Sequence, residues 1–135
     1  MVKIGNIELP DFPLLLAPME DVSDPPFRRL CKMHGADMMY SEFISSEGLI
    51  RDAIKSRMKL DIFDYERPVG IQIFGGDEEA MAMSSKIVSA VNPDIFSRSV
   101  KPCFLGGGNW AATYARTGRD LSLRNLQIRI GKSYL

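Results

Sequence analysis

The sequence predicts an α/β protein built around a parallel sheet. Short apolar runs alternate along the chain with segments whose apolar residues recur at helical spacing. The unbroken run Leu14-Leu15-Leu16 is typical of a parallel strand that is covered on both faces. Strands that alternate with helices indicate βαβ units, which join parallel strands through right-handed crossovers.

The first elements follow from local signals. We expect a short strand or hairpin arm over residues 4–9 and the first strand of the sheet over residues 14–17. Asp24 is a suitable N-cap and Pro25 suits a first helical position, so a helix is predicted over residues 25–34. Its expected apolar stripe, which places Cys31 in the core, consists of Phe27, Leu30, Cys31 and His34.

The later elements continue the alternation. We expect a strand over residues 38–41, a helix over residues 47–63 and a strand over residues 69–74. Asp77 should cap a further helix, and a fourth strand should begin at residue 94. The apolar face of that last helix is predicted to contain Ala80, Met83, Ile87, Val88 and Val91.

Composition excludes several classes of protein. The 135 residues are 45% hydrophobic, which suffices for one core. We expect a cytoplasmic location, because no run of 18 apolar residues and no basic leader followed by an apolar stretch occurs. Two cysteines and one histidine predict neither a disulfide framework nor a metal site.

Charge divides the chain at residue 95. Residues 1–95 contain 10 Lys and Arg against 16 Asp and Glu, whereas residues 96–135 contain 7 against 1. Such a shift marks either a domain boundary or a change of reading frame. We favour a frame change, because the shift falls inside a predicted strand. Residues 96–135 are then an unrelated basic tail, out of frame or disordered.

Three positions could carry chemistry. The turn Ala17-Pro18-Met19 follows a predicted strand, at the end where α/β proteins bind ligands. Ser41-Glu42 ends the next strand, where the carboxylate could position a substrate or form an ion pair that stabilises the sheet edge. Gln72 interrupts an apolar strand, and a buried amide needs hydrogen-bond partners.

Four motifs in one register, over about residues 4–95, carry a family resemblance. They are Ala17-Pro18-Met19, Asp24-Pro-Pro-Phe-Arg28, Ser41-Glu42-Phe43 and Gln72-Ile-Phe-Gly75. Together they closely resemble the N-terminal part of the bacterial-type tRNA-dihydrouridine synthases, which have a (β/α)8 catalytic barrel. The resemblance implies the N-terminal portion of a TIM barrel, truncated after about three and a half βα units, since a complete barrel takes roughly 250 residues.

The resemblance also implies an activity. The family uses FMN, reduced by NADPH, to deliver hydride to a uracil in tRNA, while a cysteine donates the proton. By this resemblance Pro18, Met19 and Glu20 contact the flavin through their main chain, and Gln72 hydrogen-bonds the polar edge of its ring. Another FMN-dependent barrel oxidoreductase is the alternative, and the Ser41-Glu42-Phe43 segment argues against it.

We expect no catalytic residue in this 135-residue chain. The family's cysteine would fall at position 102, which is Pro102, and Cys103 is out of register. We therefore expect an inactive fragment that binds FMN weakly or not at all and that self-associates or aggregates through open strand edges. A non-catalytic RNA-binding protein is a second alternative, because the basic tail contains Trp110 and Tyr114.

Overall fold

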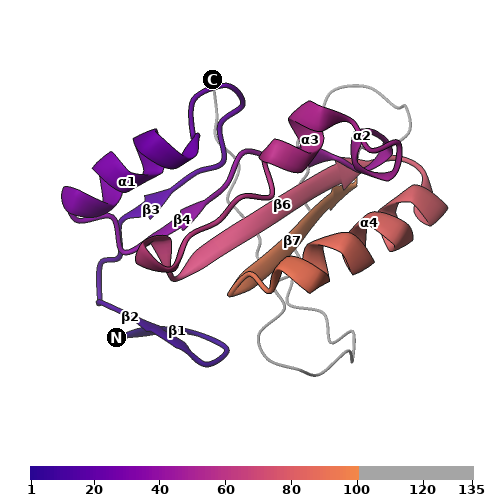
Figure 1. Cartoon of the computed structure of the whole chain (residues 1–135). Helices are drawn as coiled ribbons and strands as arrows, with labels where there is room; N and C mark the ends of the chain where they lie inside the picture. Colours follow the sequence, from indigo (N-terminus) through magenta and orange to yellow (C-terminus); the bar gives the residue numbers. More distant parts are fainter. Residues whose placement is uncertain (101–135) are drawn as a thin grey trace, which may run out of the picture.

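The computed structural model describes residues 1–100, with side chains up to Arg98. The expectations for Pro102, Cys103 and the aromatic residues of the basic tail lie outside the described residues. The central feature is one parallel sheet, with a separate two-stranded hairpin near the N-terminus (Figure 1). This arrangement confirms the predicted α/β class with a parallel sheet.

The sheet is centred on β6 (Val69–Gly75). One edge of β6 pairs in parallel with β4 (Met38–Tyr40) at its start and with β5 (Ile44–Ser45) near its end. Its other edge pairs with β7 (Ile95–Val100) over six residues, so this strand runs past the position where the charge balance changes. The short strand β3 (Leu15–Leu16) pairs with β4 and lies at the edge of the sheet.

Two longer helices lie along the sheet, and both begin at the caps that the sequence predicts. The Asp24 carboxylate accepts the Phe27 amide at 3.0 Å at the start of α1 (Pro25–Met33). The Asp77 carboxylate accepts the Ala80 amide at 2.6 Å at the start of α4 (Glu78–Val91). Capping satisfies amides that the first helical turn leaves unpaired, which explains why both helix starts are readable from the sequence.

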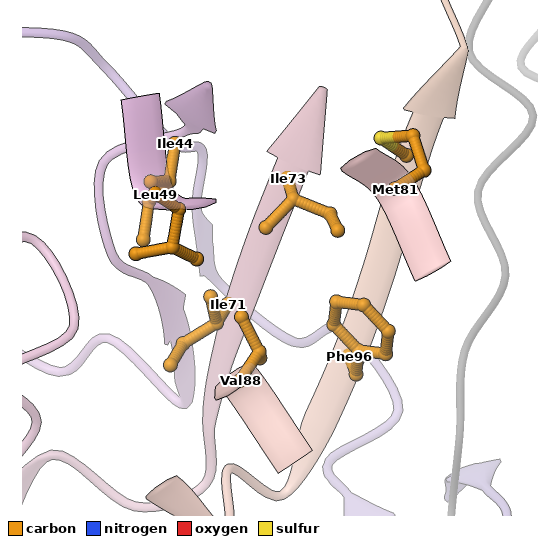
Figure 2. Close-up of a cluster of buried hydrophobic side chains, with 7 residues drawn as sticks. All are labelled: Ile44, Leu49, Ile71, Ile73, Met81, Val88 and Phe96. Carbon is orange, nitrogen blue, oxygen red and sulfur yellow. The ribbon is translucent and has the colours of Figure 1, made fainter. Parts of the chain in front are cut away.

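The main core lies between the sheet and the helices α4 and α2 (Ser46–Ile50). Alternate residues of β6 point to this side, so Ile71 and Ile73 are fully buried. Figure 2 shows their partners, which come from β5, α2, α4 and β7, with Met81 and Val88 contributed by α4. The complete cluster consists of Ile44, Leu49, Ile71, Ile73, Met81, Val88 and Phe96.

The hairpin covers the start of the strands on the opposite face. It consists of β1 (Val2–Ile4) and β2 (Ile7–Leu9), paired antiparallel, which confirms the expected hairpin arm. Leu9 packs with Met38 and Ile95, near the amino ends of β4 and β7. The carboxyl ends of the strands therefore lie away from the hairpin (Figure 1).

The predicted helix over residues 47–63 is wrong. The segment instead forms most of α2 and all of α3 (Ile54–Met58), and a short 3-10 turn, η1 (Asp64–Glu66), follows it. Asp52 between α2 and α3 has a left-handed backbone with φ of +58°, which an α-helix does not permit. The apolar spacing therefore belongs to two short helices separated by a turn.

Burial at the sheet edge also differs from the expectation. Leu14 and Leu15 are 63% and 51% exposed, because β3 has a partner strand on one side only within residues 1–100. In α1, Leu30 is 53% exposed and Cys31 is half-buried, while Arg28 is the buried residue. In α4, Met83 is exposed, and Met81 and Ser84 take part in the buried face instead.

Candidate functional site

The turn after β3 is held in shape by one serine. The amide of Met19 donates to Ser23 Oγ at 2.9 Å, and the same hydroxyl donates to the Met19 carbonyl at 2.8 Å. Ser23 is fully buried. Both main-chain polar groups of Met19 therefore have a partner inside the protein, whereas the carbonyl of Pro18 and the amide of Glu20 have none within residues 1–100.

Arg28 fixes this serine in turn. Its guanidinium donates to the Ser23 carbonyl at 2.7 Å, to the Asp61 carbonyl at 2.8 Å and to Glu66 Oε2 at 3.1 Å. The side chains of Arg28 and Glu66 are 2% and 0% exposed, so this ion pair is buried. It connects the start of α1, the loop before β6 and the turn after β3 in one network.

An irregularity between β4 and β5 directs the Glu42 carboxylate toward the same turn. Tyr40 pairs with Gly70 and Ile44 pairs with Ile73, so residues 41–43 lie opposite residues 71–72. The extra residue has the effect of a bulge, which interrupts the strand between β4 and β5 and redirects its side chains. Glu42 lies within this interruption.

Glu42 is bound to both the turn and a lysine. Its Oε2 accepts the amide of Asp21 at 3.1 Å and pairs with Lys59 Nζ at 3.2 Å. Lys59 also donates to Glu20 Oε1 at 3.2 Å. Burial lowers the pKa of Lys59, but hydrogen bonds and charge attraction from Glu42 and Glu20 outweigh it and raise the pKa above its ordinary value. Of the two roles left open for Glu42, the structure contains the ion pair.

Gln72 lies on the face of β6 that points away from α4. Its neighbours at odd positions, Ile71 and Ile73, pack in the main core, and alternation directs Gln72 to the other side. The residue is half-buried, and its side chain has no hydrogen bond to any described residue. On the same face Phe74 meets Phe43 edge to face, with ring centres 5.6 Å apart. The amide is therefore available to a ligand.

The structure places the expected site residues in the turn after β3 and on β6. Pro18, Met19 and Glu20 form the turn after β3, and Glu20 joins Glu42 through Lys59. Sequence reasoning did not identify the residues that support the turn, which are Ser23, Arg28, Lys59 and Glu66. Arg28 and Glu66 are 38 positions apart, so no spacing rule relates them. Arg28 ends the Asp24-Pro-Pro-Phe-Arg28 motif, but the motif does not indicate that its guanidinium is buried.

Residues 1–98 contain no group of three or more His, Cys, Asp or Glu side chains placed to hold a metal ion. Within the part of the chain that the structure describes, no helix is long and apolar enough to cross a membrane.

Comparison with known proteins identifies the family. Residues 15–95 match the family model described as dihydrouridine synthase (Dus). The chain is 42% identical over 83 residues to a probable tRNA-dihydrouridine synthase of Aquifex aeolicus, covering 60% of this chain and 26% of that protein. It is 40% identical over 86 residues to tRNA-dihydrouridine synthase B of Pseudomonas aeruginosa, covering 64% and 26%.

The matched segment spans about a quarter of the length of these curated relatives. It also includes every element from β3 to α4, together with the Met19 turn and Gln72. A family match over more than half of the sequence, in register with the observed strands and helices, is decisive for classification. The chain therefore belongs to the dihydrouridine synthase family.

Proposed function

We propose that residues 1–95 are the first part of the (β/α)8 barrel of a flavin-dependent tRNA-dihydrouridine synthase. The observation that carries this proposal is the family match over residues 15–95. The matched segment contains β3 with the turn that follows it and β6 with Gln72, and the carboxyl ends of these parallel strands lie at the same edge of the sheet. Ligands of barrel enzymes bind at the carboxyl ends of the strands. The proposed substrate is tRNA, because the relatives are tRNA-dihydrouridine synthases.

The donor and acceptor groups of the turn suit the polar edge of a flavin ring. Ser23 occupies both main-chain groups of Met19, so the proposed main-chain contacts come from the Pro18 carbonyl and the Glu20 amide. Met19 would contribute its side chain. Gln72 would add an amide, which offers both a donor and an acceptor. FMN, when bound and reduced by NADPH, would supply the hydride for the uracil ring.

The described residues do not supply a site for the FMN phosphate. Lys59 is a cation that contacts the turn, through Glu20, and two carboxylates already neutralise it. In barrel enzymes the phosphate site is frequently formed by loops after the seventh and eighth strands. We therefore propose that the 135-residue chain binds FMN weakly or not at all.

We do not propose that the 135-residue chain itself catalyses dihydrouridine formation. The family match ends at residue 95, and Cys103 follows Lys101-Pro102 one position beyond the expected register. A general acid must lie within hydrogen-bond reach, roughly 3 Å, of the atom that it protonates. Supplied with FMN, NADPH and unmodified tRNA, the chain should form no dihydrouridine. Activity that is lost in Cys103→Ala would contradict this.

We also propose that residues 96–135 are unrelated to the barrel and arise from a change of reading frame. The charge balance supports this boundary. Against it, β7 pairs with β6 from Ile95 to Val100 and contributes Phe96 to the main core, so the strand continues past residue 95. Resequencing the gene around the Ile95 codon and translating the other two frames tests it. Early stop codons in both frames, or the lack of a strand ending in a cysteine, would favour a genuine fusion.

A chimeric enzyme tests the proposed flavin contacts directly. Residues 15–95 of this chain would replace the matching segment of the Pseudomonas aeruginosa relative. The chimera should bind FMN and form dihydrouridine in tRNA. Gln72→Met should weaken FMN binding by about tenfold, since one hydrogen bond to a buried group is worth roughly 1.4 kcal/mol. Lys86→Met on the exposed side of α4 is the control. A folded chimera without FMN would overturn the proposal.

A further inference from the structure

Two carboxylates from different strand ends meet on one ammonium group. Lys59 Nζ lies 3.2 Å from Glu20 Oε1 and 3.2 Å from Glu42 Oε2. Lys59 follows α3 directly as its C-cap residue, so the contact joins three segments that are remote in sequence. The side chains of Lys59 and Glu42 are only 16% and 12% exposed. An ion pair this sheltered is screened much less than one on the surface.

The same carboxylate holds the main chain of the turn. Glu42 Oε2 accepts the amide of Asp21 at 3.1 Å. Asp21 has a left-handed backbone with φ of +56°, a conformation that costs a residue with a side chain free energy and persists only where its surroundings enforce it. Ser23 and Arg28 hold the helical side of the turn, so Glu42 is the contact on the side of β4.

Without Lys59, this arrangement would place two carboxylates close together with no cation between them. Like charges repel at short range. The free-energy cost of staying charged in place would be larger for Glu42, because its carboxylate is more buried than that of Glu20. Its simplest response is to turn outward to water, which would release the Asp21 amide. The position of the turn therefore depends on a residue 38 positions further along the chain.

We propose that Lys59 is a positioning residue that fixes the Pro18–Asp21 turn by holding Glu20 and Glu42 at once. Its value for flavin binding rests on the proposed function, because the turn contains the Pro18 carbonyl and the Glu20 amide. The local claim, that Lys59 orders the turn, does not need a flavin. The two can be tested separately.

Amide hydrogen exchange in the 135-residue chain measures the local claim. Lys59→Met should speed exchange of the Asp21 amide by about tenfold or more, relative to the amides of β6. Lys59→Arg keeps the charge and should retain most of the protection. Lys55→Met removes an exposed lysine of α3 and should leave exchange at Asp21 unchanged.

Three results would overturn the inference. The first is unchanged exchange at Asp21 in Lys59→Met. The second is equal acceleration at Asp21 and throughout β6, which would show general destabilisation, and a parallel fall in the urea midpoint would mark it. The third is loss of protection in Lys59→Arg equal to that in Lys59→Met. Failure of the chimera to bind FMN would count against the proposed function alone, because the exchange result does not involve flavin.

Discussion

Arg28 shows how one residue can decide the packing of a helix. The apolar stripe predicted for α1 leaves Leu30 exposed, and the helix instead buries a guanidinium against Glu66. Arg28 Nε and Glu66 Oε1 lack a hydrogen-bond partner within the described residues, so the pair is buried at a cost in desolvation. Periodicity could not predict this, because the partner lies in a separate segment before β6.

Removing one partner of this buried pair should be far more damaging than removing a neighbouring charge. Arg28→Met leaves the Glu66 carboxylate buried and uncompensated, so the free energy of unfolding should fall by about 3–5 kcal/mol. Arg29→Met removes an exposed guanidinium over the Tyr65 ring and should cost less than about 1 kcal/mol. Urea unfolding of both variants measures the difference. Equal losses would show that Arg28 is no more important than a surface arginine.

Tyr40 should make stability fall at alkaline pH. Burial raises the pKa of its phenol above the ordinary value of about 10, so the unfolded chain loses this proton first as the pH rises. Its contribution is complete below that ordinary value and is lost as the pH rises through the folded-state pKa. Lys59, whose pKa is also raised, changes stability in the same direction.

The measurement is the urea midpoint as a function of pH on the alkaline side. Tyr40→Phe should show a weaker fall in stability above about pH 10 than the wild-type chain does. Spectroscopic titration of tyrosinate should find late-ionising phenols, because the pKa values of Tyr40 and Tyr65 are both raised, and Tyr40→Phe should remove one of them. The prediction fails if the two pH profiles are parallel.

At the scale of elements, β4 and β6 approach each other through a glycine. A Cβ built on Gly70 would lie 2.6 Å from Cδ1 of the Tyr40 ring, and this ring packs against the cluster of Leu9, Met38 and Ile95. Gly70→Ala should therefore destabilise the fold by about 1–3 kcal/mol, because the ring cannot move freely. Gly76→Ala has no atom within 4 Å of the new carbon and should change stability by less than about 0.5 kcal/mol. Similar urea midpoints for the two variants would contradict this.

The elements that the sequence predicted well are those whose signals are local. The N-caps Asp24 and Asp77 and the apolar run of β6 are each complete within a few residues. The break between α2 and α3 depends on the left-handed Asp52, which an apolar period does not register. Burial of Leu15 depends on the neighbours of β3 in space, and no local pattern contains that information.

For the whole molecule, the motifs located the turn after β3, the end of β4 and Gln72. They did not reveal what holds the turn, since Ser23, Arg28 and Lys59 act through contacts between segments. A sequence motif identifies ligand-contacting residues more readily than it identifies the residues that hold those contacts in position. The roles of Pro18, Met19, Glu20 and Gln72 therefore stay predictions, to be tested by the chimera.

The final prediction concerns the association state of the 135-residue chain. Leu15 on the edge strand β3 and Leu30 on α1 are each more than half exposed. An open strand edge with apolar side chains nearby favours pairing with another molecule. Sedimentation velocity should show self-association that increases with concentration. Leu15→Lys should weaken it by about tenfold or more, because a charged side chain on an edge strand opposes pairing.

Ile54→Lys is the matched control, since Ile54 is 77% exposed but lies on α3, away from the edge strand. It should leave association unchanged if β3 and α1 form the contact. A chain that sediments as a monomer at every concentration would contradict self-association altogether. Equal weakening by Leu15→Lys and Ile54→Lys would instead indicate non-specific aggregation through scattered apolar side chains, because only a contact built on the sheet edge distinguishes the two positions.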